Sequence, residues 1–170
     1  MNMIVINIHR QILNLLDENN HLIATYPISS AKNGCGELKN SFQTPRGKHV
    51  IQEKMGDDMP IYTVFKARKA TGEIYSESLN QRFPNRDWIL TRILRLAGLE
   101  KNFNQMGHVD TFERFIYIHG THDEKNIGLP NSHGCIRMKN QDIIVLFDCV
   151  KVGDYVYIQE DESVKKKKEA

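Results

Sequence analysis

The chain has 170 residues, of which 40% are hydrophobic and 26% are charged, a composition that fits one folded domain and excludes an intrinsically disordered protein. The formal net charge is only +2, and the four lysines and one glutamate of the last eight residues, SVKKKKEA, supply all of that excess. The rest of the chain therefore lacks the basic surface expected of a nucleic-acid-binding protein. Three scattered cysteines are too few for a disulfide framework, and no stretch approaches the roughly 20 apolar residues needed to span a bilayer.

Short β-rich segments, separated by polar or glycine-containing turns, dominate the first half of the sequence. Strands are expected, in order, at residues 3–8, 11–16, 21–29, 48–54, 61–67 and 72–78. The segment 85–98 then shows apolar residues at helical spacing, with Asn85 as a possible N-cap and Gly98 where a helix should stop. It is followed by a strand at 114–120, a short helix at 140–150 capped by Asn140, and a closing strand at 154–160.

This succession of elements predicts a mainly β, single-domain fold of the sandwich or barrel-like kind, with one or two short helices. The domain is expected to cover residues 1–159, and residues 160–170 are expected to be a charged, disordered tail. No composition shift or linker marks a second domain.

The cysteines and histidines differ in their surroundings. Cys149 lies in the apolar run IIVLFDCV, where a cysteine usually acts as a small core residue, and Cys35 lies in a glycine turn where it is read as incidental. Four histidines stand alone in the sequence and are read as structural or surface residues: His9, His21, His49 and His108. Only Cys135 has several histidines near it, in the stretch IYIHGTHDEKNIGLPNSHGCIRM.

That stretch contains the parts of an acyl-transfer site. His119 ends a predicted strand, and the loop from Gly120 to Asn131 can fold back to bring Cys135 to its imidazole, which would act as the base for a nucleophilic thiol. Gly134 allows a sharp turn whose amides could stabilise an oxyanion, and the guanidinium of Arg137 suits a substrate carboxylate. The sequence also predicts that Cys135 reacts faster than free cysteine, through a stabilised thiolate.

Two other interpretations of the stretch remain open on the residues alone. His119, His122, His133 and Cys135 could ligate zinc, although neither the H-x-x-H nor the H-x-C spacing is typical of zinc proteins. The stretch could also be an ordinary polar loop, and His122 in particular is expected to be a solvated loop residue.

The quoted residues resemble a known family. SHGCIRM, preceded by IHGT and by a G-x-P element at residues 128–130, is similar to the catalytic signature of the L,D-transpeptidases of the YkuD type. The upstream segment YPISSAKNGCGELKNSFQTPRG resembles the family's T-P-x-G region, so the likeness runs from about residue 4 to 158. Residues 76–112 have no evident counterpart and are read as an insertion.

The resemblance implies a role for each matching residue. Cys135 would form a thioester acyl-enzyme, with His119 as the base oriented by the carbonyl of Gly120. Ser132 and His133 would shape the oxyanion side of the pocket, and Gly134 with Cys135 would supply its amides. Arg137 and Tyr117 would contact substrate, and no metal or other cofactor is implied.

The implied substrate is the tetrapeptide stem of peptidoglycan, cut between the L-centre of its third residue and the terminal D-alanine. Transfer to an amine would make a cross-link, and transfer to water would make the protein a carboxypeptidase of muropeptide recycling. A non-catalytic wall-binding module is the remaining alternative. No nucleic-acid or membrane partner is expected. The sequence as written shows no signal peptide, which predicts a cytoplasmic protein, or a periplasmic or wall protein if a leader was removed.

Overall fold

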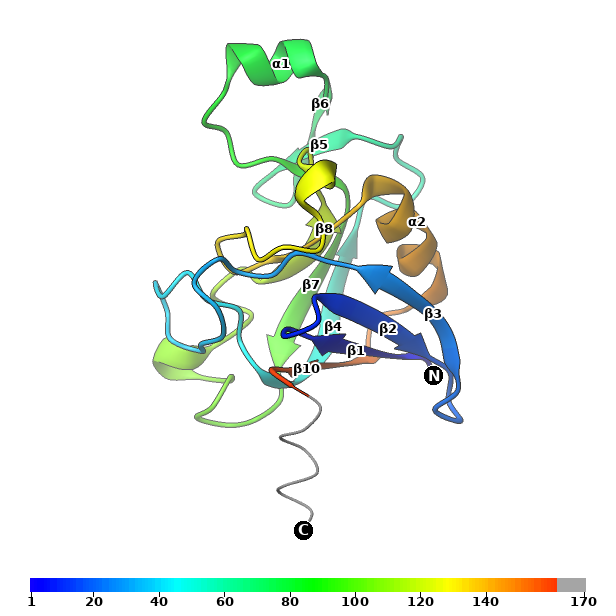
Figure 1. The fold of residues 1–170 in the computed structure, drawn as a ribbon, viewed down its shortest axis with the longest axis vertical. Helices are drawn as coiled ribbons and strands as arrows, with labels where there is room; N and C mark the ends of the chain where they lie inside the picture. Colours follow the sequence, from blue (N-terminus) through cyan, green and yellow to red (C-terminus); the bar gives the residue numbers. More distant parts are fainter. Residues whose placement is uncertain (162–170) are drawn as a thin grey trace.

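The computed structural model describes residues 1–161 and shows one strongly curled β-sheet with a helix packed against it (Figure 1). The first half of the chain supplies β1 (Met3–Asn7), β2 (Ile12–Leu16), β3 (Leu22–Pro27), β4 (Gly47–Met55), β5 (Thr63–Lys66), β6 (Lys69–Ile74) and α1 (Glu77–Arg82). The second half supplies β7 (Ile89–Gly98), β8 (Tyr117–Gly120), β9 (Ile136–Met138), α2 (Asn140–Cys149) and β10 (Tyr155–Gln159). Two single-turn 3-10 helices lie at Gly107–Val109 and Glu124–Asn126.

The mainly β prediction with one or two helices is confirmed, and the strand order shows how the sheet is built. Its main path runs β3-β2-β1-β10-β4-β7-β5-β6, and β8 and β9 branch from the other edge of β7. The pairs β1–β10 and β8–β9 are parallel, whereas the remaining pairs are antiparallel. The sequence predicted neither β7 nor β9 as a strand.

The expected helix at 85–98 is wrong: Ile89–Gly98 forms β7, the strand from which the sheet branches. This strand is buried on both faces, so its apolar residues do not alternate with polar ones, and a buried run of that kind cannot be told from a helix by periodicity. Gly98 ends a strand and not a helix. A Cβ at Gly98 would lie 2.0 Å from the Asn104 carbonyl oxygen, so the close approach of that loop requires glycine.

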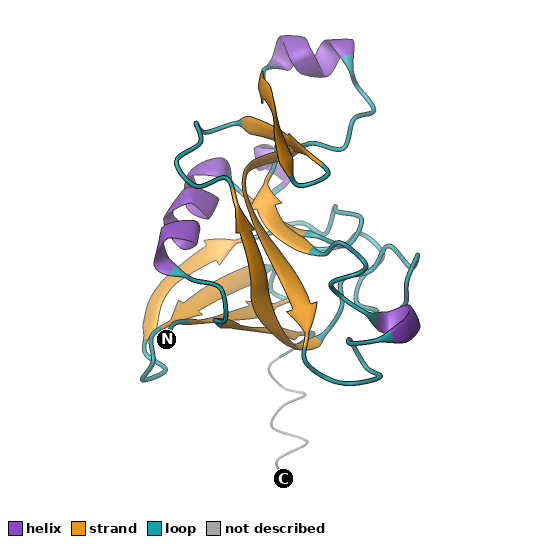
Figure 2. Cartoon of the chain, turned by 180° about the vertical axis from the view of Figure 1, so that it is seen from behind, coloured by secondary structure: helices purple, strands orange, loops and turns teal. Residues whose placement is uncertain are grey.

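This result also corrects the view that residues 76–112 are an insertion, because β7 is a structural strand of the domain. What does project from the body is the segment 75–88, which contains α1 and extends beyond β5 and β6 (Figures 1 and 2). We call residues 75–88 the lobe. It is attached by Trp88, whose side chain is buried against Val64 and Leu90 and donates from Nε1 to Asn80 Oδ1 at 2.9 Å.

Three smaller expectations fail for local reasons. The predicted strand at 72–78 ends at Ile74, and Ser76 instead caps α1 by accepting the Leu79 N–H at 3.1 Å. Asn140 is not a cap: it is the first residue of α2, and its buried side chain donates to the Thr121 carbonyl at 2.7 Å. Cys149 is exposed at the end of α2 and is not part of the core.

The main core lies between the sheet and α2. Buried hydrophobic residues from β1, β2, β4, β7, β8, β9 and β10 form one cluster with Ile143, Leu146 and Phe147 of α2, which packs on β7 and β8. No helix within residues 1–161 is long and apolar enough to cross a bilayer. Most of the charged tail expected at 160–170 lies outside the described residues.

Candidate active site

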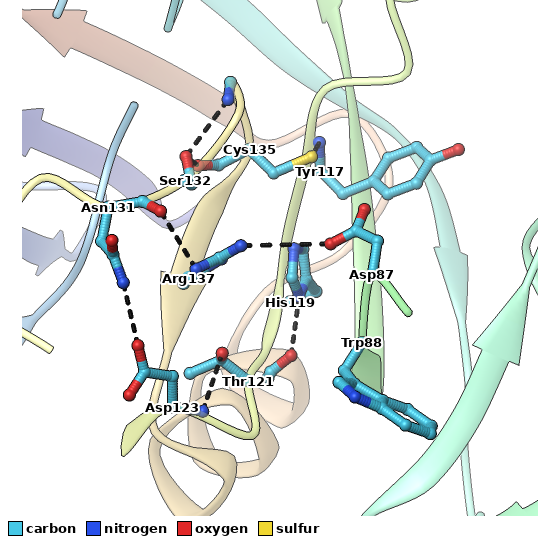
Figure 3. Close-up of polar contacts among 12 residues, drawn as sticks. Asp87, Trp88, Tyr117, His119, Thr121, Asp123, Asn131, Ser132, Cys135 and Arg137 are labelled. Carbon is cyan, nitrogen blue, oxygen red and sulfur yellow. Dashed lines mark hydrogen bonds and ion pairs between the residues drawn. The ribbon is translucent and has the colours of Figure 1, made fainter. Parts of the chain in front are cut away.

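The parallel pair β8–β9 places four of the predicted site residues together. Its register sets Ile118 against Ile136 and His119 against Arg137. Because side chains alternate along a strand, Ile118 and Ile136 point into the core, and the residues on either side of them point the other way. One face of the pair therefore carries Tyr117 and His119 from β8 and, beside them, Cys135 and Arg137 (Figure 3).

His119 is buried and held as a neutral base. The residue is only 2% exposed, and its Nδ1 lies 2.6 Å from the carbonyl oxygen of Gly120. Since a carbonyl can only accept, Nδ1 carries the proton and Nε2 is left as a proton acceptor. Burial lowers the pKa of His119 from 6.5 to about 4, so the imidazole stays unprotonated at neutral pH.

Gly120 has to be glycine for a steric reason. A Cβ there would come within 2.4 Å of Asn140 Oδ1 and 2.7 Å of the Leu90 carbonyl oxygen. The absence of a side chain thus lets β8 pass close to α2 and β7 while its carbonyl faces the imidazole. The expected orientation of His119 by this carbonyl agrees with the geometry.

The thiol of Cys135 lies against the backbone that leads into β8. Its Sγ accepts the Tyr117 N–H at 3.3 Å and donates to the Phe115 carbonyl at 3.4 Å. Burial raises the pKa of Cys135 to about 12, although the Tyr117 amide opposes the rise. Burial of the thiol thus opposes the expected stabilisation of its thiolate and favours a neutral thiol beside a neutral imidazole.

The turn before Cys135 is tied together by Ser132. The Ser132 hydroxyl donates to the Cys135 carbonyl at 2.5 Å and accepts the Gly134 N–H at 3.2 Å. Gly134 adopts φ +136°, a conformation that favours glycine, and a Cβ there would press on Ile116 and on the Gln43 carbonyl. His133 is exposed at the tip of this turn, with its ring edge-on to Phe42.

The expected oxyanion amides are thus only partly available, because the Gly134 N–H already has a partner inside the turn. Ser132 acts here as an internal tie and His133 as a surface residue beside the cavity. Neither role could be read from the order of residues in SHGC.

Two residues that sequence reasoning missed support the turn from outside. Thr44 was given no role of its own, yet its buried hydroxyl donates to the Gly134 carbonyl at 2.9 Å and accepts the Ala31 N–H at 3.0 Å. Arg114 donates to the carbonyls of Gly36 and Gln43, at 3.2 Å and 2.7 Å. The resemblance of the T-P-x-G segment to the family was the available signal for Thr44, and nothing in the sequence singled out Arg114.

A cavity of about 160 Å³ is lined by both the imidazole of His119 and the thiol of Cys135. The residues around it include Cys135, His119, Ser132, His133, Arg137 and Asp87. Asp87 comes from the lobe and was not predicted. The Tyr117 ring points away from Cys135, and its hydroxyl accepts from Arg68 at 3.1 Å, so Tyr117 meets the site through its amide (Figure 3).

The loop that follows β8 holds Arg137 in place. Asp123 accepts from the side-chain amides of Asn126 and Asn131, at 2.9 Å and 2.8 Å. The Asn131 carbonyl in turn accepts from Arg137 Nη1 at 3.2 Å. The loop at 120–131, which was expected to fold back over the end of the strand, therefore holds the guanidinium of Arg137 in place.

The remaining histidine of the motif stretch is only half-exposed. His122 was expected to be solvated, but its Nδ1 is buried and its ring lies 5.7 Å from that of Tyr75. Within residues 1–161 the structure gathers no three histidine, cysteine or acidic side chains in an arrangement that could hold a metal ion.

Comparison with known proteins then assigns the chain. A model of the L,D-transpeptidase catalytic domain, YkuD, matches residues 1–158. The chain belongs to this family. The "Probable L,D-transpeptidase YbiS" of Escherichia coli K12 is 50% identical over 52 residues, 31% of this chain and 17% of the relative. The "Probable L,D-transpeptidase YcfS" of the same strain is 28% identical over 159 residues, 91% of this chain and 43% of the relative.

Solved structures agree on the fold of this L,D-transpeptidase domain. L,D-transpeptidase 3 from Mycobacterium tuberculosis, solved with a faropenem-derived adduct, superposes with a TM-score of 0.54 at 16% identity, covering 94% of this chain and 60% of that one. The chain spans less than half the length of the two curated relatives.

Proposed function

We propose that the protein is a cysteine-dependent L,D-transpeptidase acting on peptidoglycan tetrapeptide stems, with Cys135 as nucleophile and His119 as general base. The observation that carries the proposal is the placement of an imidazole with a free Nε2 and a thiol on one face of β8–β9, around a single cavity. Family membership supports the general class of reaction.

The neutral resting pair determines how the thiol is activated. With the pKa of Cys135 raised to about 12 and that of His119 lowered to about 4, a preformed ion pair is disfavoured. The proton therefore moves to Nε2 as sulfur attacks the carbonyl carbon of the third residue. This step requires the S–H to turn from the Phe115 carbonyl, where it now points, towards His119.

The rest of the cycle returns the proton. The tetrahedral oxyanion collapses, the bond to the nitrogen of D-alanine breaks, and the imidazolium gives its proton to that nitrogen. A thioester remains on Cys135. An acceptor then attacks the thioester while His119 takes the acceptor's proton, and the released sulfur recovers it. An amine acceptor gives transpeptidation, and water gives L,D-carboxypeptidase activity.

The test is mass spectrometry of the protein incubated with a disaccharide-tetrapeptide, alone and with an added D-amino acid. Exchange of the terminal residue or a cross-linked dimer supports the transpeptidase, whereas loss of D-alanine with gain of water supports the carboxypeptidase. Cys135→Ala should abolish both reactions, and Cys35→Ala and Cys149→Ala should keep them. Release of D-alanine by Cys135→Ala would refute the mechanism, and no reaction by any form would favour a wall-binding module.

A further inference from the structure

The wall of the cavity holds a guanidinium that no carboxylate neutralises. Arg114 lines the cavity together with Cys135. Within residues 1–161 it forms no ion pair, and the carboxylate of Glu37, on the loop that Arg114 holds, is bound instead to Arg46 at 2.9 Å. A half-buried charge without a counter-charge is costly. Fastening a loop does not require that charge, because a neutral side chain can donate hydrogen bonds as well.

Three of the five N–H groups of this guanidinium fasten the neighbouring loop. Nη1 donates to the Gly36 carbonyl at 3.2 Å, and Nη2 donates to the Gln43 carbonyl at 2.7 Å and to Ser41 Oγ at 3.3 Å. The Nε–H and one N–H on Nη1 have no acceptor in the described part of the chain. The Nε of Arg114 is not sealed in the interior, in contrast to the Nε of Arg92, which is buried without a partner. Arg114 therefore keeps both its charge and two donors available.

The guanidinium lies beside the turn that carries the thiol. The Gln43 carbonyl, which it holds at 2.7 Å, is an atom that a Cβ at Gly134 would meet at 3.3 Å. The carbonyl of Phe115, the next residue along the chain, accepts the S–H of Cys135 at 3.4 Å. Burial lowers the pKa of Arg114 and raises that of Cys135, and the interaction between these two groups opposes both shifts. The cation is therefore close enough to act on a negative charge at the sulfur.

The other sources of positive potential around the thiol are already engaged. The Gly134 N–H, which was expected to face an oxyanion, donates to Ser132 Oγ at 3.2 Å. Arg137 is a second cation of the same cavity, but Asp87 lies 4.0 Å from it and offsets its charge. Among the described residues that line the cavity, Arg114 is thus the arginine whose charge no carboxylate offsets.

We propose that Arg114 stabilises, through its charge, the anion that develops during acyl transfer on the Cys135 sulfur and then on the tetrahedral oxyanion. The inference rests on the proposed function and adds the source of the positive potential that the reaction requires. A full charge in a partly buried cavity acts on such an anion more strongly than it would in water. Three hydrogen bonds hold the guanidinium before substrate binds, so it need not reorganise during the attack.

Two substitutions separate the charge of Arg114 from its hydrogen bonds. Arg114→Lys keeps the positive charge and loses the planar set of donors, whereas Arg114→Gln keeps an amide donor and loses the charge. We expect kcat for D-alanine release to fall about 10²-fold in Arg114→Gln and no more than about tenfold in Arg114→Lys, with KM changed by less than about threefold in both. A loss in Arg114→Lys as large as in Arg114→Gln, or a parent-like kcat in Arg114→Gln, would overturn the proposal.

Arg92→Gln is the matched control for removing a buried arginine. Arg92 is 7% exposed and donates to the carbonyls of Met59 and Thr91, but it packs on Phe147 and is not among the residues that line the cavity. The substitution should lower the free energy of unfolding and leave kcat of the folded protein within about twofold of the parent value. A fall in kcat as large as that of Arg114→Gln would contradict a specific role for the charge of Arg114.

A second measurement needs no peptidoglycan substrate. Below the pKa of Cys135, its rate of alkylation follows the fraction of thiolate, which falls when a nearby positive charge is removed. Iodoacetamide should therefore modify Cys135 at least about threefold more slowly in Arg114→Gln than in the parent, and within about twofold of the parent rate in Arg114→Lys and Arg92→Gln. An unchanged or faster rate in Arg114→Gln would overturn the proposal. If the parent protein shows no acyl transfer, the proposed function fails, and this arm still decides whether the charge acts on the thiol.

Discussion

The two sides of the cavity are built in opposite ways. The β8–β9 side is almost wholly buried, and its register alone brings His119, Arg137 and the thiol of Cys135 together. The lobe side contributes Asp87 from a segment that projects beyond the sheet and contains no buried residue in α1. The groups proposed to carry the chemistry are thus placed on paired strands, whereas Asp87 faces them from a segment whose helix has no buried residue.

Replacing the base should give the largest effect on the strand side. His119→Gln retains a donor for the Gly120 carbonyl but cannot accept the thiol proton, so kcat/KM for D-alanine release should fall by roughly 10²- to 10⁴-fold. His9→Gln, an exposed histidine, is the control. Circular dichroism would show whether the variant is folded. A folded His119→Gln protein with near-normal turnover would exclude this residue as the base.

The neutral thiol predicts an unusual order of alkylation. Because burial raises the pKa of Cys135 to about 12, its thiolate is scarce at neutral pH, and iodoacetamide should modify it at least about a hundredfold more slowly than free cysteine. Peptide mapping over time should find the exposed Cys149 labelled first. Faster labelling of Cys135 than of Cys149 would show instead that the ion pair exists at rest.

Acid should destabilise the folded domain through two buried histidines. Burial lowers the pKa of both His119 and His49 from 6.5 to about 4. Between pH 6.5 and pH 4 both imidazoles bind a proton in the unfolded chain but not in the folded one. Their contribution to the free energy of unfolding is therefore fully present above pH 6.5 and is lost as the pH falls towards 4. The expected slope is about 1.4 kcal/mol per pH unit for each histidine.

Urea unfolding at several pH values between 7 and 4 measures that slope. His49→Gln should roughly halve it, because one of the two buried neutral imidazoles is then gone. His49 lies away from the cavity, between the Gly47 carbonyl and the Thr111 hydroxyl. An unchanged slope in His49→Gln would mean that other groups dominate the acid response.

Removing the tie inside the turn should have an intermediate effect. Ser132→Ala leaves the Gly134 N–H and the Cys135 carbonyl without their partner, which should cost about 1–3 kcal/mol of stability and lower kcat by displacing the thiol. Ser78→Ala, at an exposed position of α1, should change neither quantity. Thermal unfolding and D-alanine release test both parts, and parent-like values for Ser132→Ala would show that this hydroxyl is not needed to hold the turn.

The smallest effect on stability is expected on the lobe. Asp87→Asn removes a largely exposed carboxylate with no hydrogen bond to Arg137, so the free energy of unfolding should change by less than about 0.5 kcal/mol. Chemical denaturation would show this. A much larger loss would mean that Asp87 supports the fold, and the contrast between the two sides of the cavity would then disappear.

The sequence predicted most of the strands and failed at the longest one, where burial on both faces removed the alternation. β1, β2, β4 and β10 lie close to their expected positions, whereas β7 was mistaken for a helix because nearly all of its residues are buried. The motif residues were predicted for the same site because strand and turn bring them together locally. Asp87 and Thr44 were missed because only the tertiary structure brings them to residues 134–137.

The position of β10 has a consequence for how the molecule folds. Tyr155–Gln159 lies between β1 and β4 and joins the β1–β2–β3 half of the sheet to the half that carries β7, β8 and β9. The strand that connects the halves is thus made after all the other strands of residues 1–161, and its pairing with Met3–Asn7 closes a loop that contains those strands. Contacts so distant along the chain slow the rate-limiting step. The β1–β2–β3 meander therefore keeps one edge unpaired until β10 has been made.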